Sequence, residues 1–259
     1  MVKKRILYVS QEITPYLPEN DLSKTSRFLP QAMNESGIDV RLFMPRFGCI
    51  NERRHQLHEV IRLSGMNLIV NDIDQPLIIK VASIPQARMQ VYFIDNEEYF
   101  KRKFTTEDKK GDFYSDNDER ALFFCRGVIE SVKKLGWSPD VIHCNGWMAS
   151  FLPMYLKKFY HDDPIFEKTK IVVSLYNQSF EGTLSDGLTD KLKFDGYSEE
   201  ELAGFEKVDY KKLAETAINY SDAVIKGSTE LDADLLKLIE DSKLPTLEYS
   251  DGEYKEQYK

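Results

Sequence analysis

The feature that most constrains the fold is an alternation along the chain. Short apolar runs of strand length are separated by longer segments whose apolar residues recur at helical spacing. Strands that alternate with helices favour a parallel sheet covered on both faces. The sequence therefore predicts an α/β, Rossmann-like domain with right-handed crossovers. The predicted strands are Arg5–Ser10, Val40–Met44, Ile78–Ala82, Gln90–Ile94, Val141–Cys144, Ile171–Leu175 and Ala223–Lys226.

Amphipathic segments between these runs predict the helices. Two of them stop directly before Gly37 and Gly136, and glycine is the residue that most readily ends a helix. The predicted helices are Asp21–Ser36, Asp116–Leu135, Trp147–Tyr160, Tyr210–Tyr220 and Leu231–Ile239. Two further segments differ from this pattern. We expect His55–Met89 to be an excursion of paired strands and Glu98–Gly111 to be a polar loop.

The domain boundary is placed near residue 240. The last residues, beginning with the run EYSDGEYKEQYK at Glu248, show no apolar periodicity. Segments without such periodicity at a chain end are commonly poorly ordered. We therefore predict one domain over residues 1–240 and a flexible tail over residues 241–259.

Charge and cysteine content exclude several classes of protein. The chain has 35 Lys and Arg against 43 Asp and Glu, a net charge of −8 without a basic cluster. That balance argues against binding to nucleic acid or to an anionic membrane surface. No apolar run reaches the length of a membrane span. The three cysteines, Cys49, Cys125 and Cys144, are odd in number and widely spaced. This favours reduced thiols in a cytoplasm, without a disulfide framework.

No metal or cofactor site is predicted. His55 and His58 would share one side of a helix, but no further ligand stands near them in the sequence. A metal site needs three or four ligands. A solvated helix face is therefore the expected arrangement. Dinucleotide, Walker, nucleophile-elbow and paired-histidine motifs do not occur either.

In an open parallel sheet, ligands bind beyond the carboxyl ends of the strands. Four such ends are informative: Ser10 to Glu12 with the proline-rich loop after them, HCNGWM from His143, LYNQSFEGTL from Leu175 and KGSTE from Lys226. A loop that holds phosphate usually contains glycine, because the backbone must approach the ligand closely. The first glycine in this chain is Gly37, so the first loop lacks that composition.

Each candidate at these strand ends has two readings. His143 reaches a crevice, or it is hydrogen-bonded and fixes the end of its strand. Asn177 and Gln178 bind sugar hydroxyls, or they cap a turn. Tyr176 and Phe180 stack on a sugar ring, or they belong to the core. The residues alone leave these alternatives open.

Collinear motifs give the chain a family resemblance. They are ILYVSQEITPYL, LPQAMNESGIDVRLFMPRFG, VYFIDNEEYFKR, YSDNDERALFF, PDVIHCNGWMASFLPMYLK, VVSLYNQSFEG and AINYSDAVIKGS. From about Lys3 to about Leu236 they resemble the N-terminal domain of bacterial glycogen synthases and plant starch synthases. The resemblance implies the N-terminal half of a two-domain GT-B glycosyltransferase. Such enzymes transfer glucose from ADP-glucose, with retention, in an active site between the two domains.

Several ligand-facing positions of that family differ here. Its Lys-Thr-Gly-Gly donor loop falls on Pro18 to Asp21, so two carboxylates stand where donor phosphate would lie. Its Asp-Trp-His reads Gly146, Trp147 and Met148, and its active-site histidine falls on Tyr176. A sugar-contacting tyrosine falls on Phe100, while Asn177 is retained. The second domain of the family, with most of the nucleotide contacts, has no counterpart in the printed sequence.

These observations leave two main functions open. One is a glycogen or starch synthase-like module without full glucosyltransferase activity, which binds glycan, scaffolds or regulates. The alternative is an active enzyme that moves glucose from ADP-glucose or UDP-glucose to an α-1,4-glucan, completed by a separate second domain or chain. A third reading is an unrelated small-molecule reaction that uses His143 and Glu12.

The predicted partners follow from the resemblance. They are ADP-glucose or α-1,4-glucan, and a protein on the face that a second domain would cover. The predicted crevice is lined by Glu12, Asn20, Lys24, His143, Asn145, Trp147, Tyr176, Asn177 and Gln178.

Overall fold

The computed structural model describes residues 3–250, 252 and 254. Over these residues its centre is a sheet in which seven strands run parallel to one another. In spatial order they are β10 (Thr246–Leu247), β9 (Ala223–Lys226), β8 (Lys170–Leu175), β7 (Val141–Asn145), β1 (Arg5–Ser10), β2 (Asp39–Pro45) and β6 (Met89–Asp95). Six of the predicted strands lie in this parallel part, which confirms the Rossmann-like architecture.

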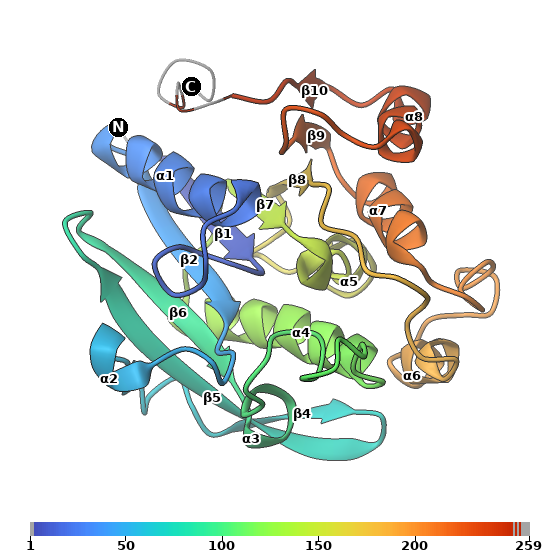
Figure 1. The fold of residues 1–259 in the computed structure, drawn as a ribbon, viewed down its shortest axis with the longest axis horizontal. Helices are drawn as coiled ribbons and strands as arrows, with labels where there is room; N and C mark the ends of the chain where they lie inside the picture. The colour runs from blue at the N-terminus through green and yellow to red at the C-terminus, as the bar shows by residue number, and fades with distance from the viewer. Residues whose placement is uncertain (1–2, 251, 253, 255–259) are drawn as a thin grey trace.

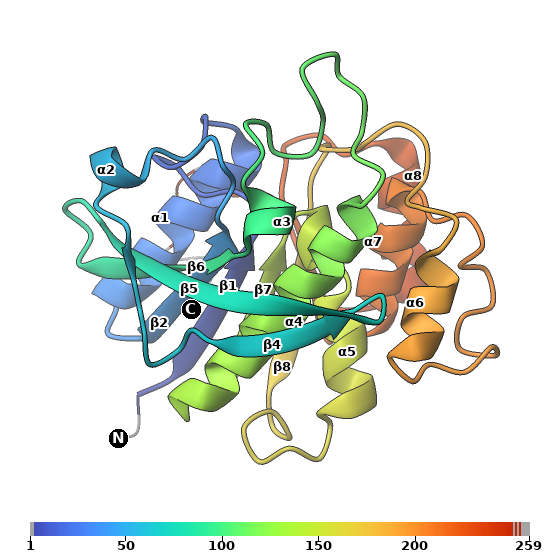
Figure 2. The ribbon, with the colours of Figure 1, turned by 90° about the horizontal axis from the view of Figure 1, so that it is seen from below.

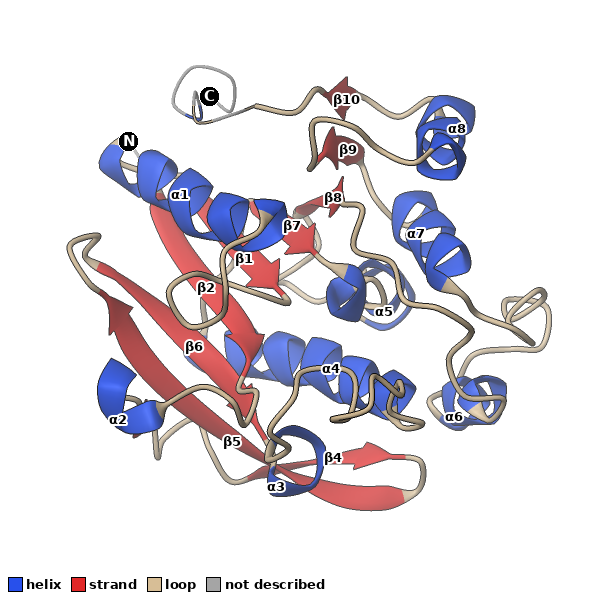
Figure 3. Cartoon of the chain, in the orientation of Figure 1, coloured by secondary structure: helices blue, strands red, loops and turns tan. Residues whose placement is uncertain are grey.

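Helices cover both faces of the sheet. The longer ones are α1 (Asp21–Glu35), α4 (Asn117–Leu135), α5 (Leu152–Phe159), α7 (Tyr210–Asn219) and α8 (Ala233–Ser242). The shorter ones are α2 (Glu52–His55), α3 (Glu97–Phe100), α6 (Leu188–Phe194) and the 3-10 turn η1 (Trp147–Ala149). Helix α1 lies on one face, and α4, α5 and α7 lie on the other (Figures 1 and 3). The helix expected over Trp147–Tyr160 is divided into η1 and α5.

The excursion after α2 forms paired strands, as predicted. It contains β3 (His58–Glu59), β4 (Met66–Val70) and β5 (Ile73–Ile84), and β5 pairs antiparallel with β3, β4 and β6. Asn71 and Asp72, both at positive φ, form the two-residue turn between β4 and β5. The hairpin lies across α4 (Figure 2), where the Arg126 guanidinium donates to the Ile69 carbonyl at 2.6 Å. The sheet is therefore mixed at this edge.

The prediction that His55 and His58 share a helix face is wrong. Helix α2 ends at His55 because Gln56 adopts a left-handed conformation, with φ 54°, and His58 already belongs to β3. A left-handed residue other than glycine is hard to recognise from sequence. Among the residues that the structure describes, no group of three or more His, Cys, Asp or Glu is arranged to hold a metal ion.

The end of the chain differs from the predicted tail in the part that the structure covers. Helix α8 continues to Ser242, and Thr246 and Leu247 pair with β9 as the short strand β10. Residues 251, 253 and 255–259 of the predicted tail lie outside the described residues. Among the described residues, no helix is long and apolar enough to cross a membrane.

Candidate functional site

The carboxyl ends of the central strands form one rim of the sheet, and an open hollow lies at this rim. Its volume is about 560 Å³, within the usual range for a small-ligand site. The lining residues are Asn20, Asp21, Asn177, Gln178, Ser228, Thr229 and Glu230. Three predicted crevice residues, Asn20, Asn177 and Gln178, therefore meet here. The lining is rich in amides, hydroxyls and carboxylates, and among the described residues it contains no lysine or arginine.

Helix α1 begins at this hollow, and its first turn is capped by its own side chains. The Ser23 amide donates to Asn20 Oδ1 at 2.7 Å, and the Asn20 amide donates to Ser23 Oγ at 2.9 Å. Asn20 Nδ2 also donates to Glu12 Oε2 at 2.6 Å. A helix N-terminus attracts anions partly through backbone donors without partners. Here this reciprocal cap already occupies the Ser23 amide, and a carboxylate lies beside the cap.

The charge around this first turn is negative. Glu12 is half-buried behind Asn20, and burial raises the pKa of its carboxyl, although hydrogen bonds from Asn20 and Gln11 oppose that effect. Glu19 is exposed in the loop before α1, and Asp21 is exposed at the first position of the helix. Each close pair of like charges costs about 1 kcal/mol in water and more at a protein surface. Lys24 is exposed one turn further along α1, and it does not line the hollow.

His143 does not reach the rim. It is 4% exposed, its Nε2 lies 2.7 Å from Ser174 Oγ on the neighbouring strand, and its ring packs against Tyr8. Burial lowers the pKa of His143 to about 3, because the charged imidazole would lose its hydration. The structure thus corrects the placement of His143 in the crevice and agrees with the reading that it fixes its strand.

The buried His143 predicts a loss of stability in mild acid. The unfolded chain binds a proton near the ordinary histidine pKa of about 6.5, whereas the folded chain binds it only near 3. Stability should therefore fall as the pH drops below about 6.5, by about 2 kcal/mol at pH 5. Urea denaturation measures this slope.

His143→Gln should flatten that slope, whereas His55→Gln should change it much less. The pKa of His55 is lowered too, but His55 is only partly buried. Equal slopes in the wild type and in His143→Gln would contradict the account.

Asn145 and Tyr176 are buried, and their side chains are hydrogen-bonded to each other. The Tyr176 hydroxyl donates to Asn145 Oδ1 at 2.9 Å. The phenol ring packs against Gly227 at the end of β9, where a Cβ would lie only 2.4 Å from the ring. Tyr210 donates its hydroxyl to the Tyr176 carbonyl at 2.5 Å. Tyr176 therefore cannot act at the rim without repacking, and its prediction as a crevice residue is corrected together with that of Asn145.

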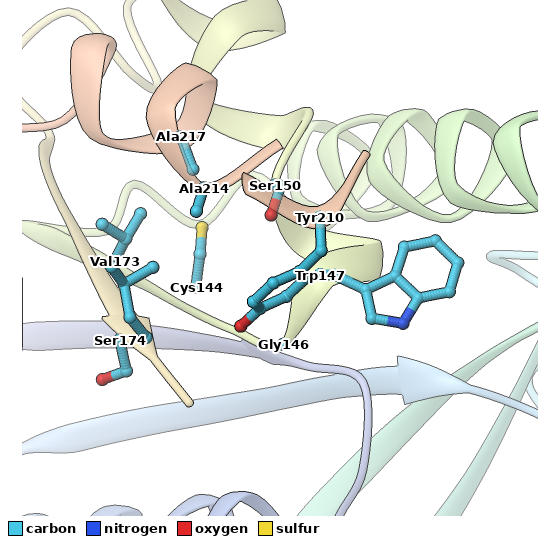
Figure 4. Close-up of a pocket in the computed structure, with 10 residues that line it drawn as sticks. Cys144, Gly146, Trp147, Ser150, Val173, Ser174, Tyr210, Ala214 and Ala217 are labelled. Carbon is cyan, nitrogen blue, oxygen red and sulfur yellow. The ribbon is translucent and has the colours of Figure 1, made fainter. Parts of the chain in front are cut away.

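Trp147 is a core residue in this structure. Its ring packs against Phe113 and Phe180, whose own rings stack 4.7 Å apart at an angle of 17°. Trp147 and Tyr210 also border a small cavity, about 10 Å³ in volume, beside Cys144 and η1 (Figure 4). Such a space holds at most one water molecule. The expected sugar platform is thus not exposed at Trp147 or Tyr176, and Phe100 is fully buried.

Asn177 joins the loops after β8 and β9. Its Nδ2 donates to the Glu230 carbonyl at 2.7 Å, and its Oδ1 accepts from the Asp232 amide at 2.9 Å. The side chain is nevertheless exposed and lines the hollow. Gln178 follows it, and Gln178 Oε1 has no hydrogen-bond donor among the described residues. Asn177 therefore shapes the hollow by linking two of its walls.

Asn177→Ala is expected to loosen the loop after β9. Two hydrogen bonds are lost, and each contributes roughly 0.5–1.5 kcal/mol. Amide exchange at residues 229–232 should rise, and Asn177→Asp should have a smaller effect because it keeps the acceptor for the Asp232 amide. Unchanged exchange in Asn177→Ala would refute the linking role. Exchange measured by mass spectrometry resolves this segment.

Four residues of the hollow were not among the predicted site residues. Asp21 immediately follows the predicted Asn20, and Ser228, Thr229 and Glu230 belong to the segment KGSTE at the end of β9. Their position at a strand end was the available signal.

A family comparison fits this arrangement. The model of the starch synthase catalytic domain family matches residues 5–243. The chain belongs to the starch synthase catalytic domain family. This membership confirms the resemblance inferred from the collinear motifs, and it identifies the chain as a glycogen or starch synthase-like glycosyltransferase domain.

Curated relatives of this starch synthase-family chain include bacterial glycogen synthases. Those of Chlorobium luteolum and Chlorobium limicola are each 38% identical to it, with 73% of this chain and 39% of each relative covered. That of Chlorobium phaeobacteroides is 34% identical, over 90% of this chain and 47% of the relative. The chain thus spans less than half the length of these curated relatives.

A solved structure shares the fold of this family member. It is the catalytic domain of starch synthase IV from Arabidopsis thaliana bound to ADP and acarbose. The TM-score is 0.77 at 17% sequence identity, and the match covers 96% of this chain and 52% of the other. At this identity the likeness shows a common fold.

Proposed function

We propose that this starch synthase-family chain is a binding module that does not by itself transfer glucose. The observation that carries the proposal is the first turn of α1. Its reciprocal cap and the carboxylates of Glu19 and Asp21 lie where the family resemblance places the donor-phosphate loop, and Glu12 accepts a hydrogen bond from Asn20 in that loop. An anionic donor would meet like charge there, and one of the backbone donors is already engaged.

A second observation supports the proposal. The resemblance aligns an active-site histidine of the family with Tyr176, which is buried and hydrogen-bonded to Asn145. A catalytic group must reach a reacting atom within hydrogen-bond distance. In its present position Tyr176 does not fulfil that condition. We accordingly propose the module as a glycan-binding, scaffolding or regulatory unit, located in the cytoplasm and built like the first half of a GT-B enzyme.

The alternative is an active glucosyltransferase completed by a second domain or chain. The curated relatives favour it, because they are glycogen synthases and this chain covers only 39% to 47% of those compared above. ADP in the starch synthase IV structure points in the same direction. In this reading, ADP-glucose or UDP-glucose is the donor and an α-1,4-glucan is the acceptor.

A transfer assay separates the two functions. The purified chain is incubated with labelled ADP-glucose or UDP-glucose and maltohexaose, and lengthened oligosaccharide is measured. The module predicts no transfer above a boiled control. Transfer by the chain alone would contradict the proposal, and transfer only after addition of a second protein would establish the completed enzyme.

A further inference from the structure

The chain between α3 and α4 forms a folded loop that projects from the rim of the sheet. This loop, residues 103–115, is the tall green loop in Figure 2. It is closed on itself by an antiparallel bridge between Glu107 and Phe113. Phe113 also stacks on Phe180, which belongs to the loop after β8 that lines the hollow at the rim. A movement of the loop 103–115 would therefore change the border of this hollow.

An ion pair joins the two ends of this loop. Arg102 directly precedes the loop and Asp116 directly follows it. The guanidinium donates from Nη1 to Asp116 Oδ1 at 2.6 Å and from Nη2 to Oδ2 at 2.5 Å. Asp116 is also at the N-cap position of α4, but among the described residues its side chain makes no cap hydrogen bond. Its carboxylate thus binds Arg102 and leaves the helix that it begins uncapped.

A second, buried guanidinium next to Asp116 has an unused donor. Arg120 is fully buried, its Nε donates to the Tyr99 carbonyl at 2.8 Å, and its Nη1 donates to Asn117 Oδ1 at 2.5 Å. Its Nη2 has no acceptor among the described residues. Burial lowers the pKa of Arg120 to about 10, and the nearby charge of Asp116 opposes this effect. A buried cation without a bound anion is strongly unfavourable.

Aromatic rings supply part of the compensation for the charge of Arg120. Its guanidinium lies 5.7 Å from the ring centre of Phe47, 5.4 Å from that of Phe100 and 5.3 Å from that of Tyr114. Ring faces attract a cation, but they do not replace a carboxylate as hydrogen-bond acceptor. Residues four positions apart at a helix are neighbours. The Asp116 carboxylate can therefore reach Arg120 once Arg102 releases it.

We propose that Asp116 is a latch with two positions. In the structure it binds Arg102 and closes the base of the loop 103–115. In the second position it binds Arg120 Nη2, and the loop can move away from the hollow. Because the carboxylate has a cationic partner in both positions, the free-energy difference between the closed and the open loop is small. This inference goes beyond the proposed function, since it holds for a binding module and for an enzyme alike.

Hydrogen exchange measured by mass spectrometry on the full chain tests the latch. Arg102→Met removes the first partner of Asp116, so exchange in residues 103–115 should become about tenfold faster. Exchange in residues 120–124 of α4 should stay unchanged, because Asp116 then pairs with Arg120. The control is Lys101→Met, which removes a neighbouring lysine whose pair with Glu97 is exposed. It should change exchange in neither segment.

The double variant Arg102→Met with Asp116→Asn decides between one position and two. Asn keeps an oxygen that can cap a helix, and it removes only the charge. If Asp116 serves Arg120 after Arg102 is lost, the added substitution should make exchange in residues 120–124 about tenfold faster. Exchange there equal to that of Arg102→Met alone would overturn the proposal, because Asp116 would then have no second partner. Unchanged exchange of the loop in Arg102→Met would overturn it as well.

Discussion

Lys191→Met is expected to lower the free energy of unfolding by about 3–5 kcal/mol, because it leaves a buried carboxylate without its partner. Lys191 Nζ lies 2.7 Å from Asp118 Oδ2 and 2.8 Å from Glu119 Oε1, and Asp118 is fully buried. Burial raises the pKa of Asp118 even with the ammonium present, so the carboxyl depends strongly on that partner. The ion pair also joins α6 to the first turn of α4. Urea denaturation at neutral pH gives the change.

Two controls isolate the buried charge. Lys193→Met removes a lysine from the same helix whose partner, Glu199, is exposed, so its effect should be much smaller than that of Lys191→Met. Adding Asp118→Asn to Lys191→Met should recover part of the lost stability, since the uncompensated charge disappears. A loss in Lys191→Met no larger than in Lys193→Met would contradict this account.

Trp147→Ala is expected to lower the free energy of unfolding by about 3–5 kcal/mol, because it removes a buried aromatic ring. The ring is 4% exposed and packs against Phe113 and Phe180, which come from two different loops. Removing it should release both loops. The same denaturation experiment measures the loss, and exchange of the amides around Phe113 and Phe180 should increase with it.

Trp147→Phe serves as the matched control, since it keeps an aromatic ring and should lose less stability. An exposed sugar platform would behave differently: Trp147→Ala would then leave stability within about 0.5 kcal/mol of the wild type. That outcome would restore the reading of Trp147 as a ligand contact.

The strands and helices were predictable because their signals are local. Apolar periodicity locates β1 and α4, and the left-handed Gly136 marks the end of α4. Pairing direction is less local. The run Ile78–Ala82 has a strand pattern, but this pattern does not predict that β5 pairs antiparallel with β6. The left-handed Gln56 likewise depends on its surroundings.

The candidate site was predictable only to the level of strand ends. His143 and Tyr176 lie at such ends. Their side chains are nevertheless in the core, where His143 contacts Ser174 and Tyr176 contacts Gly227, both far away in the sequence. Asn20 and Asn177 are separated along the chain by most of the domain, and tertiary folding brings them to one hollow. Side-chain direction and long-range contacts are therefore what one sequence leaves undetermined.

Binding of ADP-glucose tests the central claim most directly, namely that the rim of this starch synthase-family domain does not accept the nucleotide donor. Thermal unfolding of the purified chain is followed with increasing ADP-glucose and, separately, ADP. A ligand at about 100 times its Kd adds roughly 2.7 kcal/mol and shifts the Tm by several degrees. The account predicts no shift with either compound. A saturable shift of several degrees would contradict it and would mean that the capped turn of α1 still receives phosphate.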